Sequence, residues 1–353
     1  MECNKTFKQK KILLPIILSG GNGKRLLPLS TAAHPKQFLR LTNNFSLLQN
    51  TIKRLEKNKN ILPPLIVSNL EHKKILLQQL KEIDAQFTNI FFEPLSRNTA
   101  PAITLATIAA YKNYADPIIL ILPSDHHIEN KVKFQQALTN ATKLANKNFI
   151  VTFGVLPKDA NTNYGYIKTE NLDNKYIVKS FKEKPSSALA KKYLRAKNYF
   201  WNSGMLMFKA SIFLNKIKLH QPKLFDICNK INIQQSIKNK LSFYNQKIFA
   251  QLPNISIDYA FMEKIKNALM VPLNCGWSDI GSWQTLTSLQ NNVDKNGNIT
   301  IGNIICEQVK NSYIYTQNKK IVAIDINNLI IIETDNTILI SNKNNCAKIK
   351  TFY

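Results

Sequence analysis

The sequence lacks three features that would each define a class of protein. Its five cysteines lie far apart and form no C-x-x-C pair, which predicts reduced thiols in the cytoplasm rather than a disulfide framework. No apolar run comes near the roughly 20 residues that a membrane span needs, so we expect no membrane partner. Runs of five or six like charges are also missing, as is any basic stripe with interleaved aromatic residues.

Acidic residues are scarce. The chain has 22 Asp and Glu against 48 Lys and Arg, a net charge of +26, which would ordinarily suggest a nucleic-acid partner. The excess is mostly lysine scattered among asparagine and isoleucine, a pattern that AT-rich coding DNA produces by itself. We therefore disfavour nucleic acid as a partner and keep a basic nucleic-acid-binding protein only as an alternative. A basic surface also attracts phosphorylated substrates.

The size and the periodicity of the chain indicate its fold class. With 353 residues and 44% hydrophobic content, it suffices for one large α/β domain and a smaller piece. Apolar strands are predicted at 12–18, 64–68, 89–93 and 116–122, with helices between them at 46–57, 71–83 and 99–114. Strands that are apolar on both faces and separated by helices predict a doubly wound, Rossmann-like sheet that is mixed but mainly parallel. Ligands of such sheets bind at the carboxyl ends of the strands.

The predicted secondary structure changes twice in the second half of the chain. Residues 149–208 look like mixed strands that complete the sheet, and 211–270 look mainly helical. Beyond 291, short strands with polar turns predict a small C-terminal β appendage, whose loose repeat does not by itself establish a β-helix. We expect a nucleotide-handling domain over 1–290 and a β-rich domain over 291–353. A homo-oligomer is compatible with the sequence.

The first strand leads into a glycine-rich loop. Gly20, Gly21 and Gly23 follow it within four positions, and the cations Arg25 and Lys36 come soon after. Glycines let backbone N–H groups turn toward an anion, so the stretch predicts a loop that holds phosphate. An ordinary turn between a strand and a basic helix start is the simpler alternative.

Neither of the commonest phosphate motifs fits this loop. A Walker A loop needs glycine where the chain has Leu18, and a dinucleotide fingerprint needs glycine at Leu26.

The lysines before residue 12 and the apolar run 12–18 also resemble the start of a signal peptide. That run has only seven residues and includes Pro15, so we favour a buried strand.

The whole pattern resembles a known family. G-G-x-G-x-R-L-x-P-L-S followed by P-K-Q-F-L resembles the signature of sugar-nucleotide pyrophosphorylases, closest to the mannose-1-phosphate guanylyltransferases. E-P-L-S-R-N-T-A-P-A-I, L-P-S-D-H, E-K-P, W-N-S-G-M and C-G-W-S-D-I-G-S-W follow in the family's order. The resemblance spans residues 12 to 340. It implies a form without the isomerase half of the longer bifunctional relatives.

The resemblance implies a magnesium-dependent nucleotidyl transfer. Mannose 1-phosphate would attack the α-phosphorus of GTP in line, forming GDP-mannose and releasing pyrophosphate. The attacking oxygen is already on the sugar phosphate, so catalysis is positioning and charge neutralisation. Arg25 and Lys36 would hold the triphosphate, and Lys184 the sugar phosphate. A pyrophosphorylase for another hexose 1-phosphate or nucleotide is the alternative within the same chemistry.

The nucleotide is expected at the glycine loop. The resemblance implies contacts from Ser19, Gly20, Gly21 and Gly23, and from Asp125. The backbone at Ser19–Gly21 is one candidate for recognising guanine. Asn98 is the other candidate for the base, although Asn98 and Thr99 are equally consistent with helix caps.

The resemblance also implies that Asp125 and Asp279 hold Mg²⁺, because each lies in a motif that resembles one of the family's metal-binding turns. Carboxylate oxygens are hard ligands that suit this ion. Each residue also has a simpler interpretation, Asp125 as a turn or helix cap and Asp279 as part of an aromatic-capped loop. We treat His126 and His127 as turn residues rather than zinc ligands.

A sugar pocket completes the site implied by the resemblance. It would use the backbone at Gly165 together with Glu183, Asn202 and Asp258. Asn202 donates and accepts, which suits a sugar diol. Simpler alternatives remain open here too: Asp258 as a helix cap, Glu183-Lys184 as a solvated helix start, and Asn202 in a core turn.

Overall fold

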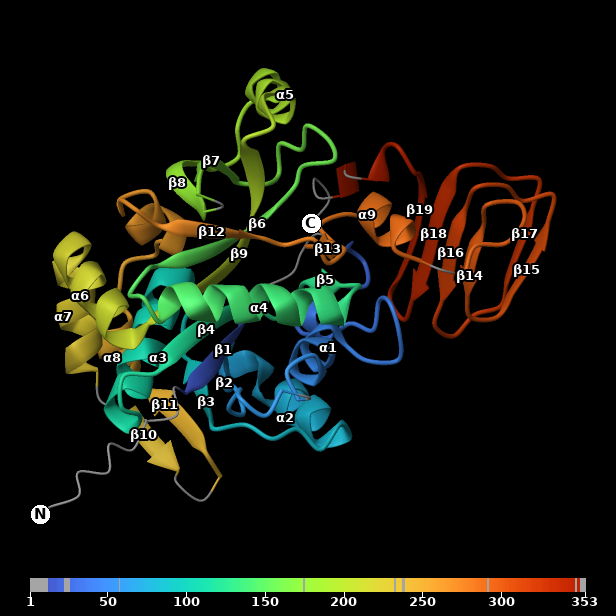
Figure 1. Cartoon of the computed structure of the whole chain (residues 1–353). Coiled ribbons are helices and arrows are strands. Elements are labelled where there is room, and N and C mark those ends of the chain that lie inside the picture. Colours follow the sequence, from blue (N-terminus) through green and yellow to red (C-terminus); the bar gives the residue numbers. More distant parts are fainter. Residues whose placement is uncertain are drawn as a thin grey trace, which may run out of the picture.

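The structure is a computed structural model that describes residues 12–21, 26–56, 58–173, 175–231, 233–236, 239–290, 292–346 and 348–349. It is an α/β protein in which one 11-stranded sheet carries helices on both faces, and a set of C-terminal strands extends to one side (Figure 1). The predicted α/β class with a mixed sheet is confirmed.

Four parallel strands near the N-terminus form the half of the sheet that the sequence predicted best. They are β1 (Leu13–Ser19), β2 (Leu65–Asn69), β3 (Asn89–Glu93) and β4 (Ile118–Pro123), in the order β3-β2-β1-β4. All lie within two residues of their predicted bounds. Their side chains alternate between two cores, with Leu14 and Ile16 in one and Leu13 and Ile17 in the other. Burial on both faces explains why these strands are continuous apolar runs.

The rest of the sheet is largely antiparallel. β9 (Tyr199–Lys209) runs antiparallel between β4 and β6 (Val151–Val155). Beyond β6 follow β12 (Leu269–Pro272), β8 (Lys175–Lys182) and β7 (Tyr166–Leu172), and at the other edge β11 (Leu241–Tyr244) and β10 (Ile233–Ser236). Only β6–β12 is parallel on the first side, and only β11–β3 on the second. The expectation of a mainly parallel sheet therefore holds only for β11-β3-β2-β1-β4.

Helices cover both faces of the sheet. One core takes α3 (Thr99–Asn113), α6 (Ala210–His220) and α7 (Pro222–Lys230), and the other takes α1 (Leu47–Lys53), α2 (Lys73–Glu82) and α4 (Lys131–Ala145). The remaining helices are α5 (Ser187–Ala196), α8 (Gln246–Phe249) and α9 (Trp283–Ser288). In the described part of the chain, no helix combines the length and the apolarity that crossing a bilayer requires.

The prediction that 211–270 is mainly helical is wrong after residue 230. This region contributes the hairpin β10–β11 and the strand β12 to the sheet. Leu241, Ser242 and Phe243 pair with the otherwise open edge of β3. Backbone groups at a sheet edge need partners, and this tertiary demand outweighs the local helical pattern.

The C-terminal strands stack as parallel coils. β14 (Ile299–Ile301), β16 (Tyr313–Thr316) and β18 (Leu329–Thr334) form one row, and β15 (Ile304–Glu307) and β17 (Ile321–Ile324) form a second (Figure 1). In the later coils the stacked residues are 17 positions apart. β19 (Thr337–Asn342) pairs antiparallel with β18. The division of the chain at 290/291 stays a prediction, since Trp283 packs in one cluster with Tyr313 and Ile330.

Candidate active site

Several predicted site residues line one cavity at the carboxyl ends of the strands. This cavity has a volume of about 540 Å³ and lies where β1, β3 and β4 end. Its lining includes the predicted residues Gly20, Gly21, Asn98, Asp125 and Asp258. Gly23 and Arg25, also predicted for this site, lie outside the described residues.

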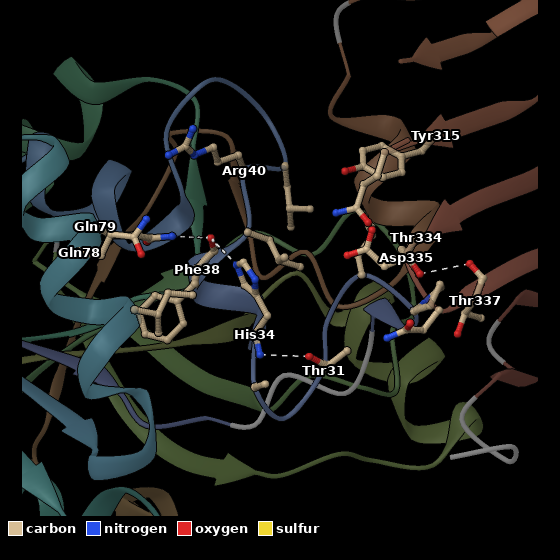
Figure 2. Close-up of a pocket in the computed structure, with 18 of the residues that line it drawn as sticks. Thr31, His34, Phe38, Arg40, Gln78, Gln79, Tyr315, Thr334, Asp335 and Thr337 are labelled. Atoms are coloured by element: carbon tan, nitrogen blue, oxygen red, sulfur yellow. Dashed lines mark hydrogen bonds between the residues drawn. The ribbon is translucent and has the colours of Figure 1, made fainter. Parts of the chain in front are cut away.

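A larger cavity, of about 850 Å³, lies elsewhere. It is bounded by residues 28–41, α2 and the C-terminal strands (Figure 2). None of the predicted site residues lines it. In Figure 2 the amide of Gln79 points from α2 to the backbone oxygen of Phe38, to which it donates at 2.8 Å. This hydrogen bond anchors the turn that contains Phe38, and Gln37 of the same turn lines the smaller cavity.

That turn is the short 3₁₀ segment Lys36–Phe38. The Lys36 side chain, only 5% exposed, donates from Nζ to Asp125 Oδ2 at 2.9 Å and to the backbone oxygen of Asp279. Gln37 donates to the backbone oxygens of Ser19 at 3.2 Å and Gly21 at 3.0 Å. The turn therefore ties the glycine loop to both aspartates. The sequence interpretation named Lys36 but missed Gln37, although the residue stands in the P-K-Q-F-L motif.

A small two-stranded sheet brings the two aspartates together. β5 (His127–Ile128) begins just after Asp125, and β13 (Trp277–Ser278) ends just before Asp279. The two strands pair antiparallel, which aligns the turns that carry the carboxylates. Trp277 adds a side-chain link, because its indole N–H donates to His126 Nδ1 at 3.2 Å.

Burial and neighbouring charges together lower the pKa values of both Asp125 and His126, so that Asp125 stays ionised and His126 stays neutral. Burial pushes the pKa of Asp125 upward, but the attraction of Lys36 and of His126 and a hydrogen bond from Lys36 outweigh it and hold that pKa at about 2. Burial lowers the pKa of His126 to about 4. His126 is thus neutral at pH 7, consistent with Nδ1 acting as the acceptor for Trp277.

The oxygen donors here fit a hard divalent cation. Asp125 is ionised at neutral pH, and Asp279 is oriented by hydrogen bonds to Oδ1 from the Tyr164 hydroxyl at 2.8 Å and the Gly281 N–H at 3.0 Å. One or two carboxylates completed by substrate phosphate oxygens are a common protein site for Mg²⁺. Tyr164 is a second residue that the sequence interpretation missed, since only its contact across the fold identifies it.

The predicted sugar-binding residues also come together. Asn202 donates from Nδ2 to Asp258 Oδ1 at 2.8 Å, and its backbone N–H donates to Gly165 O at 2.8 Å. A Cβ added at Gly165 would lie 2.5 Å from Glu183 Oε2. Gly165 is therefore the residue that lets the Glu183 carboxylate approach the backbone beside Asn202.

The acids of this pocket differ from Asp125 in their electrostatics. Burial and the neighbouring Asp258 raise the pKa of Glu183, and burial raises the pKa of Asp258. The Lys184 side chain is 57% exposed, and its Nζ lies 4.0 Å from Glu183 Oε1. Mutual repulsion and burial leave these carboxyls better suited to hydroxyl groups than to another anion.

Asn98 does act as a helix cap. Its side-chain oxygen accepts from the N–H of Thr99 at 2.9 Å at the start of α3, and its backbone, with a φ of 64° and a ψ of −168°, lies in a region that residues other than glycine rarely adopt. It is exposed at the rim of the cavity. Glu93, at the end of β3, lines the same cavity and is 6% exposed. The sequence interpretation named Asn98 from this motif and passed over Glu93.

Comparison with known proteins places this geometry in a family. Residues 14–296 match the model of the nucleotidyl transferase family. The chain is 40% identical over 343 residues to mannose-1-phosphate guanylyltransferase RfbM of Salmonella typhimurium, covering 96% of this chain and 71% of that protein. It is 39% identical to the xanthan biosynthesis protein XanB of Xanthomonas campestris, covering 96% and 72%.

A solved structure agrees with these relatives. It is described as a mannose-1-phosphate geranyltransferase from Thermus thermophilus and superposes with a TM-score of 0.82 at 26% identity, covering 96% of this chain and 98% of that one. The resemblance seen in the motifs is thereby confirmed. The chain belongs to the nucleotidyl transferase family and, within it, to the mannose-1-phosphate guanylyltransferases.

Proposed function

We propose that this protein forms GDP-mannose and pyrophosphate from GTP and mannose 1-phosphate. The observation that carries the proposal is that a cluster of charged groups and a pocket of hydrogen-bonding groups lie next to each other at one edge of the sheet. Lys36, Asp125 and Asp279 make a cationic and carboxylate cluster suited to phosphates. Asn202 and Asp258 make a hydrogen-bonding pocket suited to hydroxyl groups.

The chain's own residues position the reactants. Lys36 holds and neutralises the triphosphate, and its fixed contact with Asp125 means that little reorganisation is needed when the substrate binds. Asn202, Asp258, Glu183 and the backbone at Gly165 orient the sugar, so that its phosphate oxygen lies in line with the bond that breaks. The roles of Lys184, Arg25 and Gly23 at the phosphates rest on the resemblance alone.

Mg²⁺ is the cation that we propose for Asp125 and Asp279. When bound, it would supply neutralisation of the charge on the phosphate oxygens. Tyr164 keeps the Asp279 carboxylate oriented toward this position through its hydroxyl.

The test is a coupled pyrophosphate-release assay across three nucleotides, GTP, UTP and dTTP, each with several hexose 1-phosphates and with Mg²⁺ or EDTA. We expect release with GTP and mannose 1-phosphate, and only in the presence of the cation. Faster release with another nucleotide or sugar would assign the chain to a related pyrophosphorylase.

We also propose four broader features of the protein. They are the doubly wound, Rossmann-like description of the sheet, the domains 1–290 and 291–353, a cytoplasmic location and a homo-oligomeric state. Free thiols at Cys228, Cys275, Cys306 and Cys346 support the location.

A further inference from the structure

Arg54 is a buried cation that the proposed mechanism does not use. It is the residue that ends α1, and it is 5% exposed. Among the described residues no carboxylate forms an ion pair with it, and its Nη1 is buried without a hydrogen-bond partner. Burial lowers its pKa to about 10, so the side chain still carries its charge at pH 7. Because an unpaired buried charge is costly, the place of this one needs a reason.

We propose that Arg54 is a positioning residue for the Asp125 carboxylate, which it holds in place for the cation through the backbone of His126. This inference rests on the proposed function, because it concerns the same pair of aspartates, Asp125 and Asp279.

The Arg54 guanidinium reaches the turn that carries Asp125. Its Nη2 donates to the backbone oxygen of His126 at 2.8 Å, between residues 72 positions apart. The acceptor belongs to the residue that directly follows Asp125. The hydrogen bond therefore fixes the backbone of the turn and leaves the carboxylate itself open to other partners.

A second side chain of α1 reaches the other side of the same turn. The Thr51 hydroxyl donates to the backbone oxygen of Leu47 at 2.9 Å and, at a longer 3.4 Å, to that of Ser124, the residue before Asp125. The bond from Arg54 is shorter and has a charged donor, which makes such a bond roughly twice as strong as a neutral one. Of the two contacts, the one from Arg54 is thus expected to hold the turn more firmly.

Arg54 is itself held from several directions. Its Nε donates to the backbone oxygen of Asn50 at 3.2 Å, and its guanidinium lies over the ring of Phe134 on α4, 5.9 Å from the ring centre. Its backbone oxygen accepts from Gln135 Nε2, also on α4, at 2.8 Å. A donor fixed on two helices gives the His126 oxygen a defined position, which a flexible surface side chain could not do.

The contact with His126 bears on both aspartates. His126 follows Asp125 in the chain, and its ring accepts from the indole of Trp277, two residues before Asp279. The pairing of β5 with β13 joins the same two turns through the backbone. Residues that orient metal ligands from behind typically change metal affinity or activity by about 10- to 100-fold when they are replaced.

The competing explanation is that Arg54 only stabilises the end of α1. A cation at a helix C-terminus is favourable there, and the bond to Asn50 fits that role. The two explanations predict opposite results for Arg54→Met, which keeps a side chain of similar length without the charge. A purely stabilising Arg54 would lower Tm and leave cation binding unchanged. A positioning Arg54 would weaken cation binding with little change in Tm, because removing an unpaired buried charge offsets the lost hydrogen bonds.

The experiment measures binding of Mn²⁺ to protein saturated with GDP-mannose, from the paramagnetic resonance signal of the free ion. The Kd for Mn²⁺ should rise about 10- to 100-fold in Arg54→Met. The Kd for GDP-mannose in EDTA, measured by calorimetry, should stay at the wild-type value. Lys53→Gln is the matched control, since Lys53 is the neighbouring cation on α1 and lies 3.9 Å from Glu56; it should keep the wild-type affinity for Mn²⁺.

Each other outcome decides against the inference. An unchanged Kd for Mn²⁺ in Arg54→Met overturns it, and a lowered Tm in that case assigns Arg54 to the helix end alone. Wild type that binds GDP-mannose but no Mn²⁺ overturns the metal assignment and this inference together. The proposed function fails separately, if wild type releases no pyrophosphate from GTP with mannose 1-phosphate.

A second variant guards against an Arg54→Met protein that does not fold. Arg54→Lys keeps a cation in the same place, but its single nitrogen lies nearer the backbone and cannot hold the oxygens of Asn50 and His126 together. The Kd for Mn²⁺ should rise in this variant too, by less than in Arg54→Met. A wild-type Kd for Mn²⁺ in folded Arg54→Lys contradicts the inference.

Discussion

Replacing Gly165 by alanine tests whether the sugar pocket has the geometry described here. The added Cβ would lie 2.5 Å from Glu183 Oε2, whereas ordinary contact begins near 3.4 Å. The carboxylate must therefore retreat by about 1 Å, a displacement that can cost 100-fold in rate when it moves a positioning group. The clash involves the far end of a flexible side chain, so the fold should lose only about 1 kcal/mol.

The assay measures kcat/KM separately for the two substrates. We expect the value for mannose 1-phosphate to fall about 100-fold. The KM for GTP should stay close to wild type, because the nucleotide contacts that we propose are at Gly20 and Asp125, which line the cavity. Lys168→Ala, at an exposed position of β7, the strand that follows Gly165, should behave as wild type. If Gly165→Ala kept full activity with mannose 1-phosphate, neither Gly165 nor Glu183 would lie at the sugar.

Three further changes test other parts of the chain. Lys36→Gln should lower turnover, measured as pyrophosphate release, by about 100- to 1,000-fold, because such a loss is typical when one preorganised charge is removed. A loss of about tenfold or less would show that Lys36 does not hold the phosphates. Asp279→Asn should abolish Mg²⁺-dependent turnover with little change in Tm, because its side-chain oxygen still accepts from Tyr164; near-normal rates would refute the metal assignment. Glu333 accepts from the Thr316 hydroxyl and from three backbone N–H groups, and these hydrogen bonds lower its pKa to about 2. A depressed pKa stabilises the fold above the unfolded value of about 4.5, so Glu333→Gln should lower Tm at pH 7, and the difference should shrink as pH falls from 4.5 to 2. A difference that is independent of pH would contradict this.

The sequence alone determined the four strands β1 to β4 and named most of the residues of the candidate site. β1 to β4 are runs of isoleucine and leucine long enough to be buried on both faces, and no other local structure satisfies such runs so well. The motifs that follow these strands hold the glycine loop, Lys36 and Asp125. Their function depends on residue type and local spacing, which a sequence displays directly.

Only the tertiary structure decided how distant segments meet. Lys36 and Asp279 are 243 positions apart, and Tyr164 and Asp279 are 115 apart, so no local pattern predicts either contact. The hairpin β10–β11 forms because β3 has an edge to fill, against its local helical pattern. The burial of Glu93 with no hydrogen-bond partner at Oε1 was likewise visible only in the tertiary structure, because the energetic cost of burying a carboxyl depends on the atoms that surround it and not on its neighbours in the chain.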